Sequence, residues 1–117
     1  MSGRRTFDGS VHESIKESYE GYHAAIIDEV EAALESDDLV IVGMAQNPFC
    51  RRARKAADGA GKSYKYLEYG SYFSDWKPRL AIKMWSGWPT FPQVFWKGQL
   101  IGGAQDLERM IEQGKLE

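Results

Sequence analysis

Between residues 39 and 53 the chain reads LVIVGMAQNPFCRRA, and this stretch decides the fold. Its first four residues form a continuous apolar run rich in β-branched side chains, which predicts a strand buried on both faces. Asn47 is a favoured helix N-cap and Pro48 is favoured at the first helical position, so a helix is predicted to begin at Pro48. A buried strand that leads through a short turn into a helix is typical of an α/β fold.

The flanking segments supply the other elements of such a fold. From about residue 10 to residue 34, apolar residues recur every three or four positions, which predicts one long amphipathic helix or two helices with a break near Gly21. The later elements are a strand at residues 64–69, a helix at 77–85, a hairpin of strands 93–96 and 99–102, and a helix at 106–113. The order α-β-α-β-α-β-β-α predicts one mixed sheet of four strands flanked by helices.

Composition narrows the function classes. The 117 residues are 43% hydrophobic and 27% charged, as in an ordinary globular domain. The formal net charge of −2 provides no basic field for a phosphate backbone, so no nucleic-acid partner is expected. No run of about 18 apolar residues is present and the first residues are polar, so neither a membrane span nor a secretory signal is predicted. We therefore expect a cytoplasmic protein.

The chain has a single cysteine, Cys50. It can form no disulfide and no dithiol cycle within this chain, and one cysteine is too few for a metal site made of cysteines alone. His12 and His23 have no metal-ligand spacing, so no metal-binding residue is predicted. Any redox chemistry needs a second thiol from another molecule.

Three segments, in the expected order, resemble motifs of glutaredoxins, which belong to the thioredoxin superfamily. NPFCRRA at residues 47–53 resembles the Cys-Pro-Tyr-Cys-Arg-Arg-Ala active-site segment of dithiol glutaredoxins. WPTFPQ at 88–93 is similar to a stretch of monothiol glutaredoxins that includes a cis proline, and GGAQDL at 102–107 is similar to their turn into the last helix. The resemblance implies a thioredoxin-like α/β fold with a central four-stranded mixed sheet and an N-terminal helical extension. Residues 37–117 would form the glutaredoxin-like domain, and residues 1–36 a flexible tail and a helix of the same domain.

The resemblance also implies a glutathione site. An extended backbone at Thr90 and Phe91 could pair with a peptide-like ligand. The start of the helix near Asp106 suits the ligand's carboxylates, and Asp106 could accept a hydrogen bond from its ammonium group. The expected glutathione-binding residues are Arg79, Thr90, Phe91, Pro92, Gly103, Gln105 and Asp106. Arg79 has the spacing of an arginine that monothiol relatives use on the glycine carboxylate, whereas Met44 stands where dithiol relatives place a lysine.

The chain departs from the family at the catalytic position, where Asn47 stands in place of the nucleophilic cysteine. An amide cannot attack a disulfide as a thiolate does, and the substitution also removes the cysteine that related proteins use to hold a [2Fe–2S] cluster, so no cluster is expected. Cys50 follows within the first helical turn beside Arg51 and Arg52, where helix dipole and cations favour a thiolate, while burial would raise its pKa.

Two functional hypotheses stay open. The first is a glutaredoxin-like oxidoreductase of glutathione and thiol redox homeostasis, with weak or atypical activity that depends on an accessible Cys50 thiol and on glutathione or a protein thiol as partner. The second is a non-catalytic module that binds glutathione or a protein. The family resemblance also leaves room for a weak homodimer.

Overall fold

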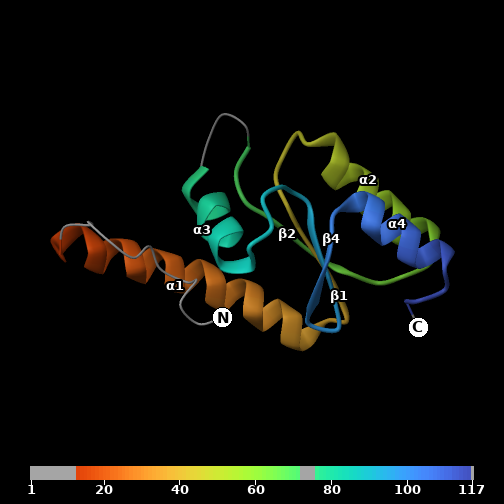
Figure 1. The fold of residues 1–117 in the computed structure, drawn as a ribbon, viewed down its shortest axis with the longest axis horizontal. Helices are drawn as coiled ribbons and strands as arrows, with labels where there is room; N and C mark the ends of the chain where they lie inside the picture. Colours follow the sequence, from red (N-terminus) through yellow and green to blue (C-terminus); the bar gives the residue numbers. More distant parts are fainter. Residues whose placement is uncertain (1–12, 72–75, 117) are drawn as a thin grey trace.

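The computed structural model describes residues 13–71 and 76–116. Its elements are α1 (Glu13–Ser36), β1 (Leu39–Gly43), α2 (Pro48–Gly59), β2 (Lys65–Glu68), α3 (Trp76–Ser86), β3 (Gln93–Trp96), β4 (Gln99–Gly102) and α4 (Ala104–Glu112) (Figure 1). This is the predicted order of elements. The expected tail and helix start at residues 1–12 lie outside the described residues.

The four strands form one mixed sheet in the order β2-β1-β3-β4. β1 is parallel to β2 and antiparallel to β3, and β3 pairs with β4 through the hairpin turn at Lys97 and Gly98. Both turn residues have positive φ, 50° and 81°, which matches the twist of the flanking strands. The thioredoxin-like four-stranded sheet expected from the sequence is therefore confirmed.

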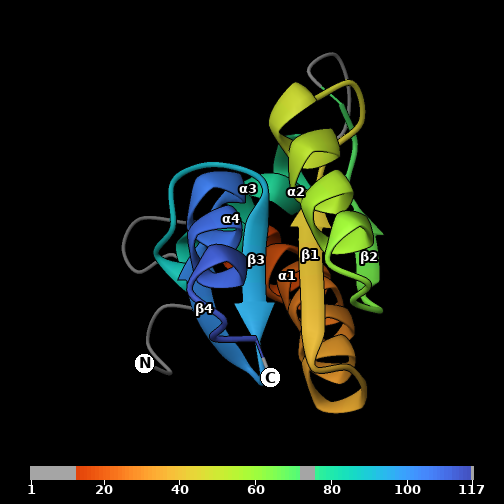
Figure 2. The same cartoon turned by 90° about the vertical axis from the view of Figure 1, so that its right-hand side faces the viewer.

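Helices cover both faces of the sheet. In Figure 2, α2 and α4 lie in front of the sheet, and α1 and α3 lie behind it. Because side chains alternate along a strand, β1 contributes to both layers. Leu39 and Ile41 pack in the cluster of α2 and α4, whereas Val40 and Val42 pack in the cluster of α1 and α3. All five residues of β1 are buried, as its apolar run predicts.

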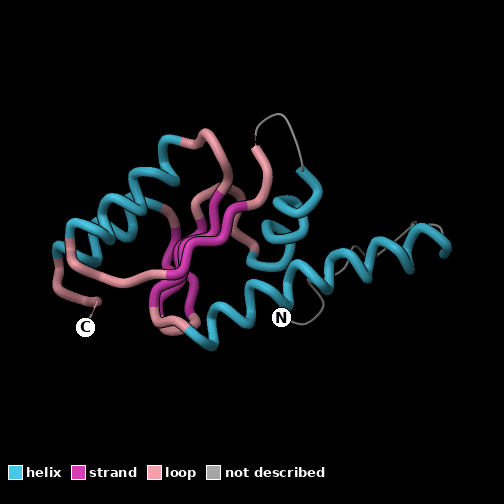
Figure 3. Tube along the Cα trace, turned by 180° about the vertical axis from the view of Figure 1, so that it is seen from behind, coloured by secondary structure: helices cyan, strands magenta, loops and turns pink. Residues whose placement is uncertain are grey.

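The helix α1 is unbroken from Glu13 to Ser36, so of the two predicted arrangements the structure has the single helix. Its C-terminal half packs on the sheet through the buried residues Ile27, Val30 and Ala33. The Tyr69 hydroxyl, just after β2, also donates a hydrogen bond to Glu29. The N-terminal half extends past the sheet (Figure 3). No helix in the described ranges is long and apolar enough to span a membrane.

The helix α2 begins at Pro48, as predicted. Its inward residues are Cys50, Ala53 and Ala57, spaced by three and four positions. Phe49 is 55% exposed and Cys50 is 1% exposed. Because successive residues lie about 100° apart around a helix, Phe49 points outward where Cys50 points inward.

Candidate functional site

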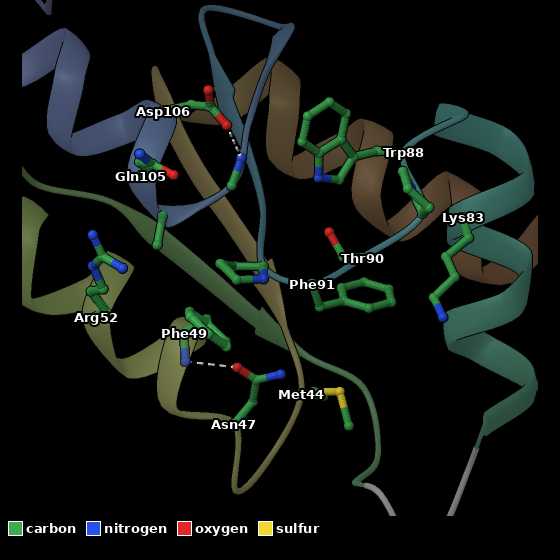
Figure 4. A pocket seen from close by; sticks show the side chains of 14 residues that line it. Met44, Asn47, Phe49, Arg52, Lys83, Trp88, Thr90, Phe91, Gln105 and Asp106 are labelled. Atoms are coloured by element: carbon green, nitrogen blue, oxygen red, sulfur yellow. Dashed lines mark hydrogen bonds between the residues drawn. The ribbon is translucent and has the colours of Figure 1, made fainter.

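A pocket of about 520 Å³ lies where the N-termini of α2 and α4 meet the loop before β3 (Figure 4). Residues from both helices, from α3 and from two loops line it: Met44, Asn47, Phe49, Arg52, Lys83, Trp88, Pro89, Thr90, Phe91, Pro92, Gly103, Ala104, Gln105 and Asp106. Seven of the nine residues predicted as site residues are in this list; Cys50 and Arg79 are not. The fold therefore brings together three segments that are far apart in the sequence.

Asn47 forms the pocket wall at the start of α2. Its Oδ1 accepts hydrogen bonds from the backbone N–H groups of Phe49 at 2.8 Å and Cys50 at 3.0 Å. These bonds satisfy two of the N–H groups that a helix start leaves unpaired. Asn47 is 6% exposed, so its amide is held in place at the pocket instead of rotating in solvent. The residue gives the helix a cap but offers no nucleophile.

Cys50 lies behind this wall, in the buried core cluster that also contains Val42, Met44 and Phe91. Its Sγ accepts a hydrogen bond from the backbone N–H of Met44 at 3.4 Å. Burial raises the pKa of the Cys50 thiol, because loss of solvation outweighs both this hydrogen bond and the nearby charge of Arg54. Of the two interpretations that the sequence left open, the geometry matches the buried thiol with a raised pKa. The accessible thiolate that the oxidoreductase hypothesis requires is not what the structure shows.

Gly43 makes room for this thiol. A Cβ atom at Gly43 would lie 2.8 Å from Cys50 Sγ and 2.9 Å from the Tyr66 hydroxyl, closer than normal contacts allow. The three residues come from β1, α2 and β2. Cys50 is therefore closely packed against β1 and β2, and it does not line the pocket.

The loop before β3 forms the middle of the pocket. The peptide bond between Phe91 and Pro92 is cis, as the resemblance to monothiol glutaredoxins implies. Thr90 is exposed and lines the pocket, so a ligand can reach this residue. Two buried polar atoms here, Trp88 Nε1 and Gln93 Oε1, have no hydrogen-bond partner within the described part of the chain. Unpaired buried groups are costly, so they are natural partners for an ordered water or a bound molecule.

The start of α4 forms the opposite wall. The helix begins at Ala104, two residues before the predicted start, with Gly103 as its N-cap. The backbone N–H of Gly103 donates to Asp106 Oδ2 at 2.9 Å, and Arg109 Nη1 donates to Asp106 Oδ1 at 3.2 Å. Gly103, Gln105 and Asp106 all line the pocket. A helix N-terminus that carries an acidic group can hold a carboxylate and an ammonium group side by side.

Arg79, which was predicted to bind the ligand, lies outside the lining of the pocket. Arg79 is 9% exposed and does not line the pocket; its Nη1 donates to the backbone oxygen of Tyr69 at 3.3 Å. It lies early in α3 and reaches the loop after β2, so it joins two structural elements. Sequence spacing placed Arg79 on the correct helix but could not show which way its side chain points.

Two cations of the pocket were not predicted as site residues. Arg52 projects from α2 and is bound by Glu108 of α4, with Nε to Oε2 at 2.7 Å and Nη2 to Oε1 at 2.5 Å. Lys83 projects from α3, and its Nζ lies 5.8 Å from the centre of the Phe91 ring. Lys83 is four residues after Arg79, and residues with this spacing share a helix face. This spacing is the sequence signal that could have identified Lys83.

The donor set does not fit a metal cluster. An iron–sulfur cluster needs thiolate ligands, and this pocket has an amide at Asn47 while the one cysteine is buried elsewhere. No group of three histidine, cysteine or acidic residues in the described ranges could hold a metal ion.

Comparison with known proteins gives consistent results. The glutaredoxin family model matches residues 39–101. A glutaredoxin-like protein of Dictyostelium discoideum is 44% identical over 116 residues, which cover 99% of this chain and 94% of that protein. A wheat glutaredoxin has a similar structure, with a TM-score of 0.67 and 27% identity over 80% of this chain and 86% of that one. The structure of a buckwheat glutaredoxin–glutathione complex matches with a TM-score of 0.66 and 24% identity over 80% of this chain and 84% of that one.

Proposed function

Because this chain belongs to the glutaredoxin family, we propose that it acts in glutathione and thiol redox homeostasis by binding glutathione in a pocket that has lost the family's nucleophile. Membership of the glutaredoxin family supports the role in redox homeostasis. The loss of the nucleophile rests on one observation: the loop at Thr90 and the start of α4 line the same pocket, and no thiol lines it.

The pocket walls suit glutathione, a tripeptide with two carboxylates and one ammonium group. The open backbone at Thr90 could pair with the peptide's backbone, as in strand addition. At the start of α4, Asp106 and the helix N–H groups could hold the α-amino acid end of the γ-glutamyl residue. The buckwheat relative with the same fold was solved as a glutathione complex.

The reaction of the family requires a thiolate at the place that we assign to Asn47. In that reaction a protein thiolate attacks a glutathione mixed disulfide, the S–S bond breaks, a new protein–glutathione disulfide forms, and the other thiol leaves. An asparagine side chain cannot carry out the first step. Any turnover by this protein therefore needs a thiol from a partner protein or from glutathione itself, and we expect it to be weak.

The buried position of Cys50 favours the second hypothesis of the sequence analysis over an oxidoreductase that works through this thiol. Cys50 is 1% exposed, has a raised pKa and lies outside the pocket. The protein would then bind glutathione, or a protein carrying it, without exchanging disulfides itself. We further propose that it holds no [2Fe–2S] cluster, works in the cytoplasm and forms at most a weak homodimer.

Calorimetry with reduced glutathione, followed by mass spectrometry after incubation with oxidised glutathione, tests this proposal. We expect saturable binding with a dissociation constant between about 10 μM and 1 mM, because the contacts are few and partly exposed to solvent. We expect no glutathione adduct on the folded protein, and the same affinity in Cys50→Ser. An adduct on Cys50 that is absent in Cys50→Ser would instead establish a thiol enzyme. Absence of binding would remove the glutathione proposal.

A further inference from the structure

We propose that Gln93 is a positioning residue, whose buried side chain holds the loop before β3 in the shape that receives glutathione. The inference rests on the proposed function, because it concerns how the same pocket binds its ligand. Gln93 does not itself line the pocket, so it acts through the loop residues that do.

The first step is the hydrogen bond that closes the loop. Gln93 is the first residue of β3, and its backbone is paired with Val42 of β1, an inner strand of the sheet. Its side-chain Nε2 donates a hydrogen bond to the backbone oxygen of Trp88 at 3.0 Å. The Gln93 side chain therefore ties the beginning of the loop to the sheet at the loop's end.

The second step is that Trp88 is also held from the other side. Its backbone N–H donates to Ser86 Oγ at 3.1 Å, and Ser86 is the last residue of α3. Trp88 is thus fixed between α3 and Gln93, and residues 89–92 all line the pocket between these two anchors. Trp88 and Thr90 lie on the same side of the pocket (Figure 4). A loop that is ordered before the ligand arrives lowers the entropy cost of binding.

The third step is the burial of the Gln93 side chain. It is 0% exposed, and its Oε1 has no hydrogen-bond partner within the described part of the chain. A buried polar atom without a partner destabilises the folded state, so an apolar side chain of the same size would suit the core at least as well. Stability therefore does not explain a glutamine at this position, whereas the need for a donor to the Trp88 oxygen does.

The test replaces Gln93 by methionine, which has nearly the same length and volume but no hydrogen-bond donor. The Trp88 oxygen could then turn to water, because Trp88 is only half-buried, and the loop would become less ordered. We expect the affinity for reduced glutathione, measured by calorimetry, to fall about tenfold. The urea midpoint of unfolding should stay unchanged or rise, because the unpaired Oε1 is removed. A merely structural role would lower affinity and midpoint together.

Val94→Ala is the matched control on the same strand. Val94 follows Gln93 directly and is also 0% exposed, but it packs in the cluster of α2 and α4. The smaller side chain leaves a cavity, so the urea midpoint should fall while glutathione affinity stays unchanged. In amide spectra of the free proteins, Gln93→Met should broaden the signals of Thr90 and Phe91, and Val94→Ala should not.

The outcomes separate this inference from the proposed function. If the unmodified protein does not bind glutathione, the proposed function is wrong and the role of Gln93 falls with it. If it binds and Gln93→Met binds equally tightly, glutathione binding stands and the role of Gln93 is overturned. A weaker affinity in Gln93→Met that comes with a lower urea midpoint, or with an equal loss in Val94→Ala, would show a structural role and would also overturn the inference.

Discussion

Replacing Asn47 by cysteine should give this protein the disulfide exchange activity of its family. The introduced thiol would take the place of an amide whose oxygen accepts from Phe49 N at 2.8 Å and Cys50 N at 3.0 Å. A thiolate there would face the same N–H groups at a helix N-terminus, which lowers a thiol pKa. Turnover of a glutathione mixed disulfide of a small thiol should rise at least about 100-fold over the unmodified protein.

Two variants make this experiment specific. Asn47→Ser keeps an oxygen at the helix cap but supplies no thiolate, so its activity should stay at background. Asn47→Cys combined with Cys50→Ser should remain active, because the second thiol is buried and is not needed when glutathione resolves the intermediate. Asn47→Cys could bind glutathione without any rise in turnover, both with Cys50 present and in combination with Cys50→Ser. In that case the pocket does not bring the ligand's sulfur to this position. That result would contradict our assignment of Asn47.

The second large effect is expected for Gly102→Ala, which should destabilise the fold and weaken ligand binding. Gly102 has a φ of 123°, and a Cβ atom there would lie 2.3 Å from Asp106 Oδ2 and 2.6 Å from its Cγ. The alanine would strain the backbone and push Asp106 away from the Gly103 N–H group. We expect the free energy of unfolding to fall by roughly 2–4 kcal/mol, from backbone strain and loss of the helix cap. Glutathione affinity should drop at least about tenfold.

Gly98→Ala is the matched control for the backbone strain. Gly98 also has a positive φ, 81°, but nothing lies within 4 Å of its Cβ position. This variant should lose only about 1–2 kcal/mol of stability and should bind glutathione as the unmodified protein does. Urea denaturation and calorimetry of both variants would measure the two effects. Equal glutathione affinity in Gly102→Ala and Gly98→Ala would show that the start of α4 is not part of the binding site.

The sequence predicted the fold because its signals are local and agree with one another. The apolar run before Gly43 predicts a buried strand, the Asn47 cap predicts the start of α2, and the Lys97–Gly98 turn predicts the hairpin. Each depends on neighbours within a few residues. Their order then permits few arrangements other than a mixed sheet between helices.

The site was harder to predict because it depends on the direction in which side chains point. Spacing could place Arg79 and Lys83 on one helix, but only the folded structure shows that Arg79 donates to the Tyr69 backbone oxygen and that Lys83 lines the pocket. Likewise, charge and helix dipole favoured a reactive Cys50, while burial in the core decides against it. A residue's helical position is local information, whereas its solvation depends on the whole fold.

The central claim is that the pocket between α2, α4 and the loop before β3 binds glutathione without covalent chemistry. Titration of reduced glutathione into the ¹⁵N-labelled protein, followed by amide chemical shifts, tests it most directly. We predict saturable shifts at Thr90, Phe91, Gly103, Gln105 and Asp106, and full reversal when glutathione is dialysed away. Unchanged spectra at millimolar glutathione, or shifts confined to the basic outer face of α2 at Arg51, Arg54 and Lys55, would contradict the claim.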